Sequence, residues 1–170
     1  CLGYGVWRML VKNAYHIYAL GVIIAFIVAY LIMPLVARLA YRVGAIDQPN
    51  ARKVHSKPMP RLGGTGIFVA FVVVILATQD LAPSLMGILL GGLTVFLVGV
   101  FDDIYRLSPW TKLAAQIIAA LIAVYFGVRV HVMTNPFDGV FQLGALSIPL
   151  TLLWVIGITN AVNLIDGLDG

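Results

Sequence analysis

Five long apolar runs divide this chain, and they constrain its fold more than any other feature. A bilayer core of about 30 Å is crossed by roughly 20 apolar residues in an α-helix. Hydrophobic residues make up 61% of the chain and charged residues only 11%, against roughly a quarter charged in a soluble domain. We therefore predict an all-α, polytopic membrane protein, with residues 1–170 in a single integral membrane domain. The five expected transmembrane helices are Ile17–Ala37, Leu62–Gln79, Leu81–Phe101, Leu113–Val128 and Leu143–Ile165.

The basic residues predict which loops face the cytoplasm, because Lys and Arg in short loops mark that side of a membrane. Six of them lie in or beside the first loop: Arg38, Arg42, Arg52, Lys53, Lys57 and Arg61. Alternation along the chain then makes loops 42–61 and 102–112 and the segment 166–170 cytoplasmic, and it places residues 129–147 outside. The polar clusters of the chain are thus expected to meet on one membrane face.

The acidic residues predict a metal site at that face. All seven are aspartates, and four of them follow apolar runs: Asp102, Asp103, Asp166 and Asp169. A charge at the bilayer centre costs at least ~2.5–3.5 kcal/mol, so acidic groups at such places suggest function. Carboxylate oxygens suit Mg²⁺ or Mn²⁺, so these four aspartates are candidate ligands for a divalent cation. The alternative is a solvated helix end. However, an aspartate at a helix C-terminus opposes the dipole, so Arg106 or a metal ion is expected beside Asp102.

The first loop is a candidate phosphate site. Its prolines forbid a continuous helix and hold the basic side chains on a stiff segment. Arg61 precedes Gly63 at the start of a helix, where free N–H groups and the dipole favour an anion. We expect His55, Lys57 and Arg61 to contact phosphate groups of a substrate. The alternative is that these charges only fix topology and touch anionic lipid head groups.

The end of the chain carries polar side chains at every third position: Asn160, Asn163, Asp166 and Asp169. On a continuous α-helix this spacing drifts by about 60° per step, so the first and last side chains would diverge. Glycines at 167 and 170 allow the backbone to turn and bring Asp169 back toward Asn163. We predict that this cluster is functional, because such a series of amides and carboxylates without a neutralising lysine nearby is rarely structural, and a capped, solvated helix end is the alternative.

Three motifs in this order resemble one known family: His55–Gly64, Phe101–Asp103 and Asn160–Gly170. The family is that of the polyprenyl-phosphate N-acetylhexosamine-1-phosphate transferases, or glycosyltransferase family 4. The resemblance covers roughly residues 17–170. The His-x-Lys-Pro-x-Pro-Arg form looks like the branch that transfers N-acetylglucosamine 1-phosphate for O-antigen, enterobacterial antigen or teichoic-acid linkage units, the first membrane step of cell-envelope polysaccharide synthesis.

The resemblance implies a reaction and its partners. A polyprenyl phosphate, such as undecaprenyl phosphate, attacks the β-phosphorus of UDP-N-acetylglucosamine and UMP leaves. Asp102, Asp103 and Asp166 would be catalytic and would hold Mg²⁺ or Mn²⁺. Asn160, Asn163 and Asp169 would bind substrate. The expected location is a bacterial plasma (inner) membrane with the active site in the cytoplasm and lipid around the helices. No nucleic-acid partner is expected, and a homodimer is left open.

The resemblance covers only the first half of the family. A further metal-ligand aspartate and a His-rich sugar-recognition segment have no counterpart here, and the chain begins with Cys1 rather than Met. We therefore expect a piece of a longer protein. The sugar stays open, and UDP-MurNAc-pentapeptide is the alternative donor.

Two other classes of protein share some of these features. An intramembrane prenyltransferase also binds Mg²⁺ through Asp-rich motifs, but it needs no basic, proline-rich loop. A cation channel or transporter would place carboxylates near mid-membrane and carry a repeated half. The sequence has neither feature, so the transferase is favoured.

Overall fold

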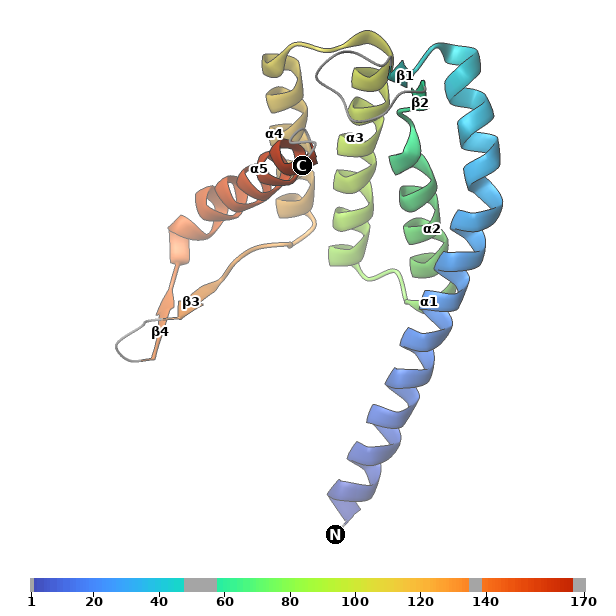
Figure 1. Ribbon diagram of the computed structural model, residues 1–170. Coiled ribbons are helices and arrows are strands. Elements are labelled where there is room, and N and C mark those ends of the chain that lie inside the picture. Colours follow the sequence, from blue (N-terminus) through green and yellow to red (C-terminus); the bar gives the residue numbers. More distant parts are fainter. Residues whose placement is uncertain (1, 48–57, 135–138, 167–170) are drawn as a thin grey trace. The chain divides into compact units, whose positions relative to one another are not determined.

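The computed structural model describes residues 2–47, 58–134 and 139–166, with side chains from 15 to 46, 58 to 134 and 139 to 164. Five helices follow one another along the described chain (Figure 1). They are α1 (Leu2–Val43), α2 (Gly63–Thr78), α3 (Pro83–Tyr105), α4 (Pro109–Tyr125) and α5 (Ser147–Asp166). The predicted all-α membrane fold is confirmed, with one helix for each apolar run.

The helices differ in length. Among the described residues, three segments are long and apolar enough to cross a membrane: Tyr15–Val43, Pro83–Tyr105 and Gly144–Leu164. The other two helices, α2 and α4, have 16 and 17 residues. At 1.5 Å per residue they measure about 24–26 Å, slightly less than the roughly 30 Å of a bilayer core. Much of the outer surface is apolar, as a lipid-facing protein requires: Phe26 and Tyr30 are each 72% exposed.

The described chain forms two compact units, of which the first is built from α1 and α2. These helices pack through glycines: a Cβ at Gly66 would lie 2.9 Å from Sδ of Met33, and one at Gly21 would lie 3.2 Å from Val74. The boundary between the units falls within two short paired strands, β1 (Ile46–Asp47) and β2 (Met59–Pro60), of which Ile46 and Pro60 belong to the first unit. The first unit therefore relies on close apolar packing. The expectation of a single membrane domain stays a prediction.

The second unit contains α3, α4, α5 and a hairpin. Helices α3 and α4 lie side by side with opposite directions (Figure 1). Gly87 and Gly91 of α3 lie one turn apart against α4, where a Cβ at Gly91 would lie 2.8 Å from the carbonyl oxygen of Ala119. Ala119 and Ala123 are buried at this contact. Small residues at such spacing let helix backbones approach closely in a membrane.

Hydroxyl groups attach the start of α5 to the segment that follows α4. Ser147 Oγ donates to the carbonyl oxygen of Val130 at 2.7 Å, and the Val130 N–H donates to Thr151 Oγ1 at 2.9 Å. Both side chains are buried. Between them runs an antiparallel hairpin of β3 (Val132–Thr134) and β4 (Val140–Gln142), followed by the 3-10 turn η1 (Gly144–Leu146). This end of the unit is thus fixed by buried hydrogen bonds.

Candidate functional site

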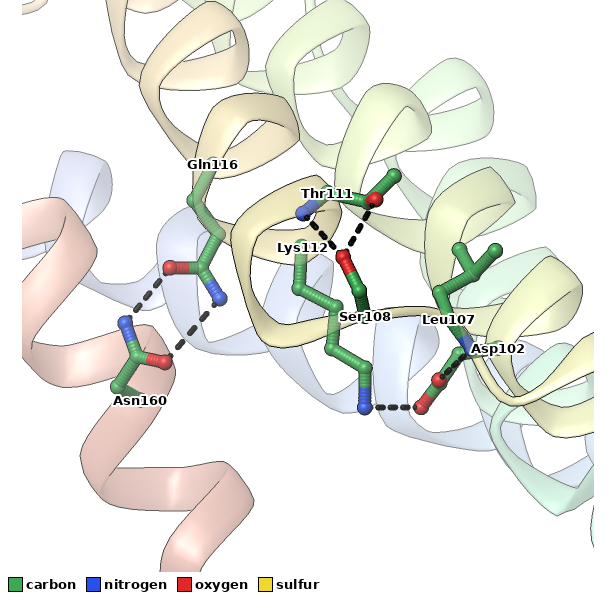
Figure 2. A network of polar contacts seen from close by, with 7 residues as sticks. All are labelled: Asp102, Leu107, Ser108, Thr111, Lys112, Gln116 and Asn160. Atoms are coloured by element: carbon green, nitrogen blue, oxygen red, sulfur yellow. Dashed lines mark hydrogen bonds and ion pairs between the residues drawn. The ribbon is translucent and has the colours of Figure 1, made fainter.

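Asp102 lies in the last turn of α3 and is held by two donors. Its Oδ1 accepts the Leu107 N–H at 2.9 Å, and its Oδ2 lies 2.6 Å from Nζ of Lys112 on α4 (Figure 2). The turn that makes this possible is at Arg106, whose backbone is left-handed with φ of +54° and whose N–H donates to the Asp102 carbonyl at 2.8 Å. The side chains of Lys112 and Asp102 are 31% and 28% exposed, so the pair is half-buried.

The position of this ion pair has a simple electrostatic reason. Asp102 lies at the negative end of the α3 dipole, and Lys112 lies near the positive start of α4, so each charge is at the unfavourable end of its helix. The ion pair between Asp102 and Lys112 offsets both unfavourable interactions with the helix dipoles. The sequence predicts a metal ion or Arg106 as the positive partner. The structure places Lys112 beside Asp102, and the metal ion stays a prediction. Lys112 was therefore missed as a site residue.

The start of α4 is fixed by a side-chain cap. Ser108 Oγ accepts the Thr111 N–H at 3.2 Å and lies 2.9 Å from Thr111 Oγ1. Pro109 follows as the first helical residue, where its missing N–H costs least. Because Lys112 is only four residues after this cap, the cap also fixes the backbone position from which the Lys112 side chain extends.

Further along α4, Gln116 is bonded to α5. Gln116 Nε2 donates to Asn160 Oδ1 at 3.3 Å, and Asn160 Nδ2 donates to Gln116 Oε1 at 2.6 Å (Figure 2). Gln116 is only 8% exposed. A buried amide is costly unless it is hydrogen-bonded, and here each amide satisfies the other. Gln116 is a second site residue that sequence reasoning missed.

A cavity of about 320 Å³ opens among α3, α4 and α5. Its polar lining comes from all three helices: Asp102, Lys112, Gln116, Thr159 and Asn163. The rest is apolar, with valines and alanine facing the same space. An apolar pocket with a few convergent polar groups is the usual form of a small-molecule site. Its charged end could hold a phosphate through Lys112, and its carboxylate could hold a cation.

The predicted site residues fall into three groups. Asp102 and Asn163 line the cavity, Asp103 is half-buried beside Asp102 on α3, and Asn160 is bonded to Gln116. Arg61 is described in the first unit, so its approach to Asp102 stays a prediction. The remaining four have positions or side chains outside the described part: His55, Lys57, Asp166 and Asp169.

Comparison with known proteins gives a consistent set of relatives. A family model described as glycosyl transferase family 4 matches residues 85–170. The probable undecaprenyl-phosphate N-acetylglucosaminyl 1-phosphate transferase of Bacillus subtilis is 43% identical over 155 residues, which cover 88% of this chain and 43% of that protein. The decaprenyl-phosphate N-acetylglucosaminephosphotransferase of Mycobacterium tuberculosis is 36% identical over 158 residues, or 86% of this chain and 39% of that protein.

The relatives also include another branch. The phospho-N-acetylmuramoyl-pentapeptide-transferase of Heliobacterium modesticaldum is 30% identical over 180 residues, covering 97% of this chain and 53% of that protein. The chain thus spans about half, or less, of the length of these relatives. No solved structure matches it.

Proposed function

Because the chain belongs to glycosyl transferase family 4, we propose that it forms part of an enzyme that transfers N-acetylglucosamine 1-phosphate from UDP-N-acetylglucosamine to undecaprenyl phosphate and releases UMP. The observation that carries the proposal is the 43% identity, over 88% of this chain, to a relative named as a probable undecaprenyl-phosphate N-acetylglucosaminyl 1-phosphate transferase. The cavity at Asp102, Lys112 and Asn163 supports it, because these groups suit a phosphate substrate.

The chemistry requires charge neutralisation more than driving force. A phosphate oxygen of the lipid attacks the sugar-bearing phosphorus, a new phosphoanhydride bond forms, and the old one breaks as UMP leaves with the bonding electrons. One phosphoanhydride replaces another, so positioning and electrostatics carry the rate. Lys112 would contact a phosphate oxygen, Asn163 would donate to a nucleotide or phosphate oxygen, and Asp102 would orient Lys112. His55, Lys57 and Arg61 would add cationic contacts from the first loop.

A divalent cation belongs to the proposal. Mg²⁺, with Mn²⁺ as the alternative, would stabilise charge on the transferring and leaving phosphate oxygens. Asp102 and Asp103 have the oxygen donors that this ion prefers. Among the side chains that the structure describes, no three acidic, histidine or cysteine groups cluster to hold a metal. Asp166, whose side chain lies outside that part, would therefore have to complete the set.

A second nucleotide-sugar substrate, UDP-MurNAc-pentapeptide, is supported by a specific observation. The Heliobacterium relative, named for transfer of a phospho-N-acetylmuramoyl-pentapeptide, matches 97% of this chain at 30% identity. The same cavity could serve that reaction, because the phosphate chemistry is shared. The higher identity to the N-acetylglucosaminyl relative favours UDP-N-acetylglucosamine. Membership in a transferase family disfavours a channel or transporter.

The deciding experiment measures both products. Membranes that lack endogenous activity and contain the whole protein receive labelled UDP-N-acetylglucosamine, undecaprenyl phosphate and Mg²⁺. We expect stoichiometric UMP and lipid-linked sugar, with none when the lipid acceptor is omitted. A parallel reaction contains UDP-MurNAc-pentapeptide. Transfer from that donor alone would overturn the choice of sugar, and no transfer from either would overturn the function.

The proposed location is a bacterial inner membrane with the site in the cytoplasm. The apolar helices support a membrane protein, and the loop charges support the orientation. Single cysteines at Lys57 and Ile104 should react with an impermeant reagent only from the cytoplasmic side, and one at Gly139 only from outside. Labelling of positions 57 and 104 from opposite faces would contradict the proposal.

A further inference from the structure

The reciprocal amide pair between Gln116 and Asn160 uses up much of the hydrogen-bonding capacity of Asn160. Besides the two bonds to Gln116, Asn160 Nδ2 donates to the carbonyl oxygen of Ile156 at 2.9 Å. An asparagine side chain has two N–H donors and one carbonyl acceptor. Both N–H donors and one lone pair of the carbonyl oxygen are therefore engaged within the protein, and Figure 2 shows the two bonds to Gln116. This geometry favours a positioning role for Asn160 over the direct substrate contact that the sequence predicts.

Helix α4 makes a polar contact with each of its two neighbours. Lys112 pairs with Asp102 of α3, and Gln116 pairs with Asn160 of α5. Lys112 and Gln116 are four residues apart, so they lie one turn apart on the same helix face. Both side chains also line the cavity. Side chains on one face of α4 thus fix the positions of both α3 and α5 beside the cavity.

The bond at Asn160 has a direct consequence for Asn163. The two residues are three positions apart on α5, which places their side chains about 60° apart around the helix axis. Asn163 lines the cavity with Asp102 and Lys112. Any rotation or shift of α5 would therefore move Asn163 relative to Asp102, and the amide pair resists such movement.

We infer that Gln116 and Asn160 are positioning residues, whose amide pair fixes α5 on α4 so that Asn163 faces the cavity opposite the Asp102–Lys112 pair. The inference rests on the proposed function for its kinetic readout. It assigns to Gln116 a role that the motifs of the sequence do not indicate. It also gives Asn160 and Asn163 different roles, whereas the sequence predicts that both bind substrate.

The kinetic test is a double-mutant cycle in the whole protein, with Gln116→Leu, Asn160→Leu and both together. We expect each single change to lower kcat roughly 10- to 100-fold through misplacement of the reacting groups. KM for the nucleotide sugar should stay within about threefold, because the substrate contacts themselves remain. The double variant should be no slower than the worse single variant, since either change already removes the pair.

Conservative changes provide a rescue. In Gln116→Asn the two side chains together are too short to span the distance between α4 and α5, and in Asn160→Gln they are too long. The double exchange restores their combined length. The double exchange should therefore have a higher kcat than either single exchange. Gln142→Leu is the matched control, because it removes the same amide from β4, outside the cavity, and it should leave kcat unchanged. A larger KM increase in Asn160→Leu than in Gln116→Leu, with effects that multiply, would show substrate contact and overturn the inference.

A second readout needs no enzymatic activity and so separates the inference from the proposed function. With other cysteines removed, Asn163→Cys is labelled by a small thiol reagent in the whole protein. Adding Gln116→Leu should change the labelling rate several-fold, and adding Gln142→Leu should not change it. An unchanged rate after loss of the amide pair would overturn the inference, whichever substrate the enzyme uses. Absence of transfer in the unmodified protein would instead overturn the proposed function alone.

Discussion

The two halves of α4 contact the neighbouring helices in different ways. In the C-terminal half, Ala119 and Ala123 meet the glycines of α3 almost backbone to backbone. In the N-terminal half, Lys112 and Gln116 reach across to neighbouring helices and border a cavity of about 320 Å³. We call the C-terminal half, which packs tightly against α3, the closed end of α4, and the N-terminal half, which borders the cavity, the open end. Small side chains produce the first and long polar side chains the second.

The difference follows from the physics of contact in lipid. Helices in a membrane gain little hydrophobic energy from each other, so small residues increase affinity by close packing. Such packing leaves no space for a substrate. Where a cavity must remain, directional bonds between long polar side chains can hold helices apart at a fixed distance. The Asp102–Lys112 and Gln116–Asn160 pairs are of this second kind.

The largest expected effect comes from removing the charge at the open end. In the whole protein, Asp102→Asn should lower kcat roughly 10²- to 10³-fold, the usual cost of losing one oriented charge-stabilising group. The amide can still accept the Leu107 N–H, so expression and folding should persist. Asp80→Asn, between α2 and α3, is the matched control. Wild-type turnover in Asp102→Asn would remove this carboxylate from the catalytic assignment.

A smaller loss is expected when the partner of Asp102 changes. Lys112→Met keeps the apolar stem but removes the charge. It should lower kcat/KM roughly 10- to 100-fold, less than the usual loss for one charge-stabilising group, because the first-loop cations would also contact phosphate. Lys112→Arg keeps the charge but differs in shape, so it should recover only part of the activity. Steady-state kinetics on both variants check this order. Wild-type activity in Lys112→Met would show that the charge at residue 112 is immaterial.

The sequence predicted the fold well because the membrane imposes it. Hydropathy and length are enough to place five helices, and their bounds agree to within a few residues except at α1, which begins at Leu2. The apolar run ends at Phe101 as predicted, but α3 continues through both aspartates to Tyr105, so the carboxylates lie in its last turn. What hydropathy cannot supply is the face that each helix presents to its neighbours.

The site was predicted less completely for the same reason. Asp102 and Asn163, which line the cavity, were proposed from the sequence because a carboxylate or an amide in or beside an apolar run is conspicuous. Lys112 was only the last residue of the predicted loop 102–112 and Gln116 was not singled out, although their four-residue spacing on α4 places them on one face. Which helices pair depends on tertiary packing. A polar i, i+4 pair on a helix rich in alanine was the signal that could have revealed them.

At the closed end, a methyl group should be enough to disturb packing. Gly91→Ala would put Cβ 2.8 Å from the Ala119 carbonyl oxygen, so a backbone must move. Overpacking of this kind costs about 1–3 kcal/mol, partly offset by the better helix propensity of alanine. The thermal midpoint of the detergent-solubilised protein should fall. Gly157→Ala on α5 meets no atom within 4 Å and should leave the midpoint unchanged or raise it. A fall of equal size in both would contradict close contact at Gly91.

The smallest effect concerns the start of α4, where the open end begins. Ser108→Ala removes the acceptor for the Thr111 N–H and should cost about 1 kcal/mol, the typical price of a lost N-cap. Ser84→Ala is the control, because it lies at the start of α3, whose N-cap Ala82 makes no side-chain cap bond. Thermal unfolding should distinguish the two variants. Since the cap precedes Lys112 by one turn, Ser108→Ala should also lower activity slightly, and by less than Lys112→Met. A larger kinetic loss from Ser108→Ala than from Lys112→Met would show that the cap, rather than the ion pair, determines the geometry of the open end.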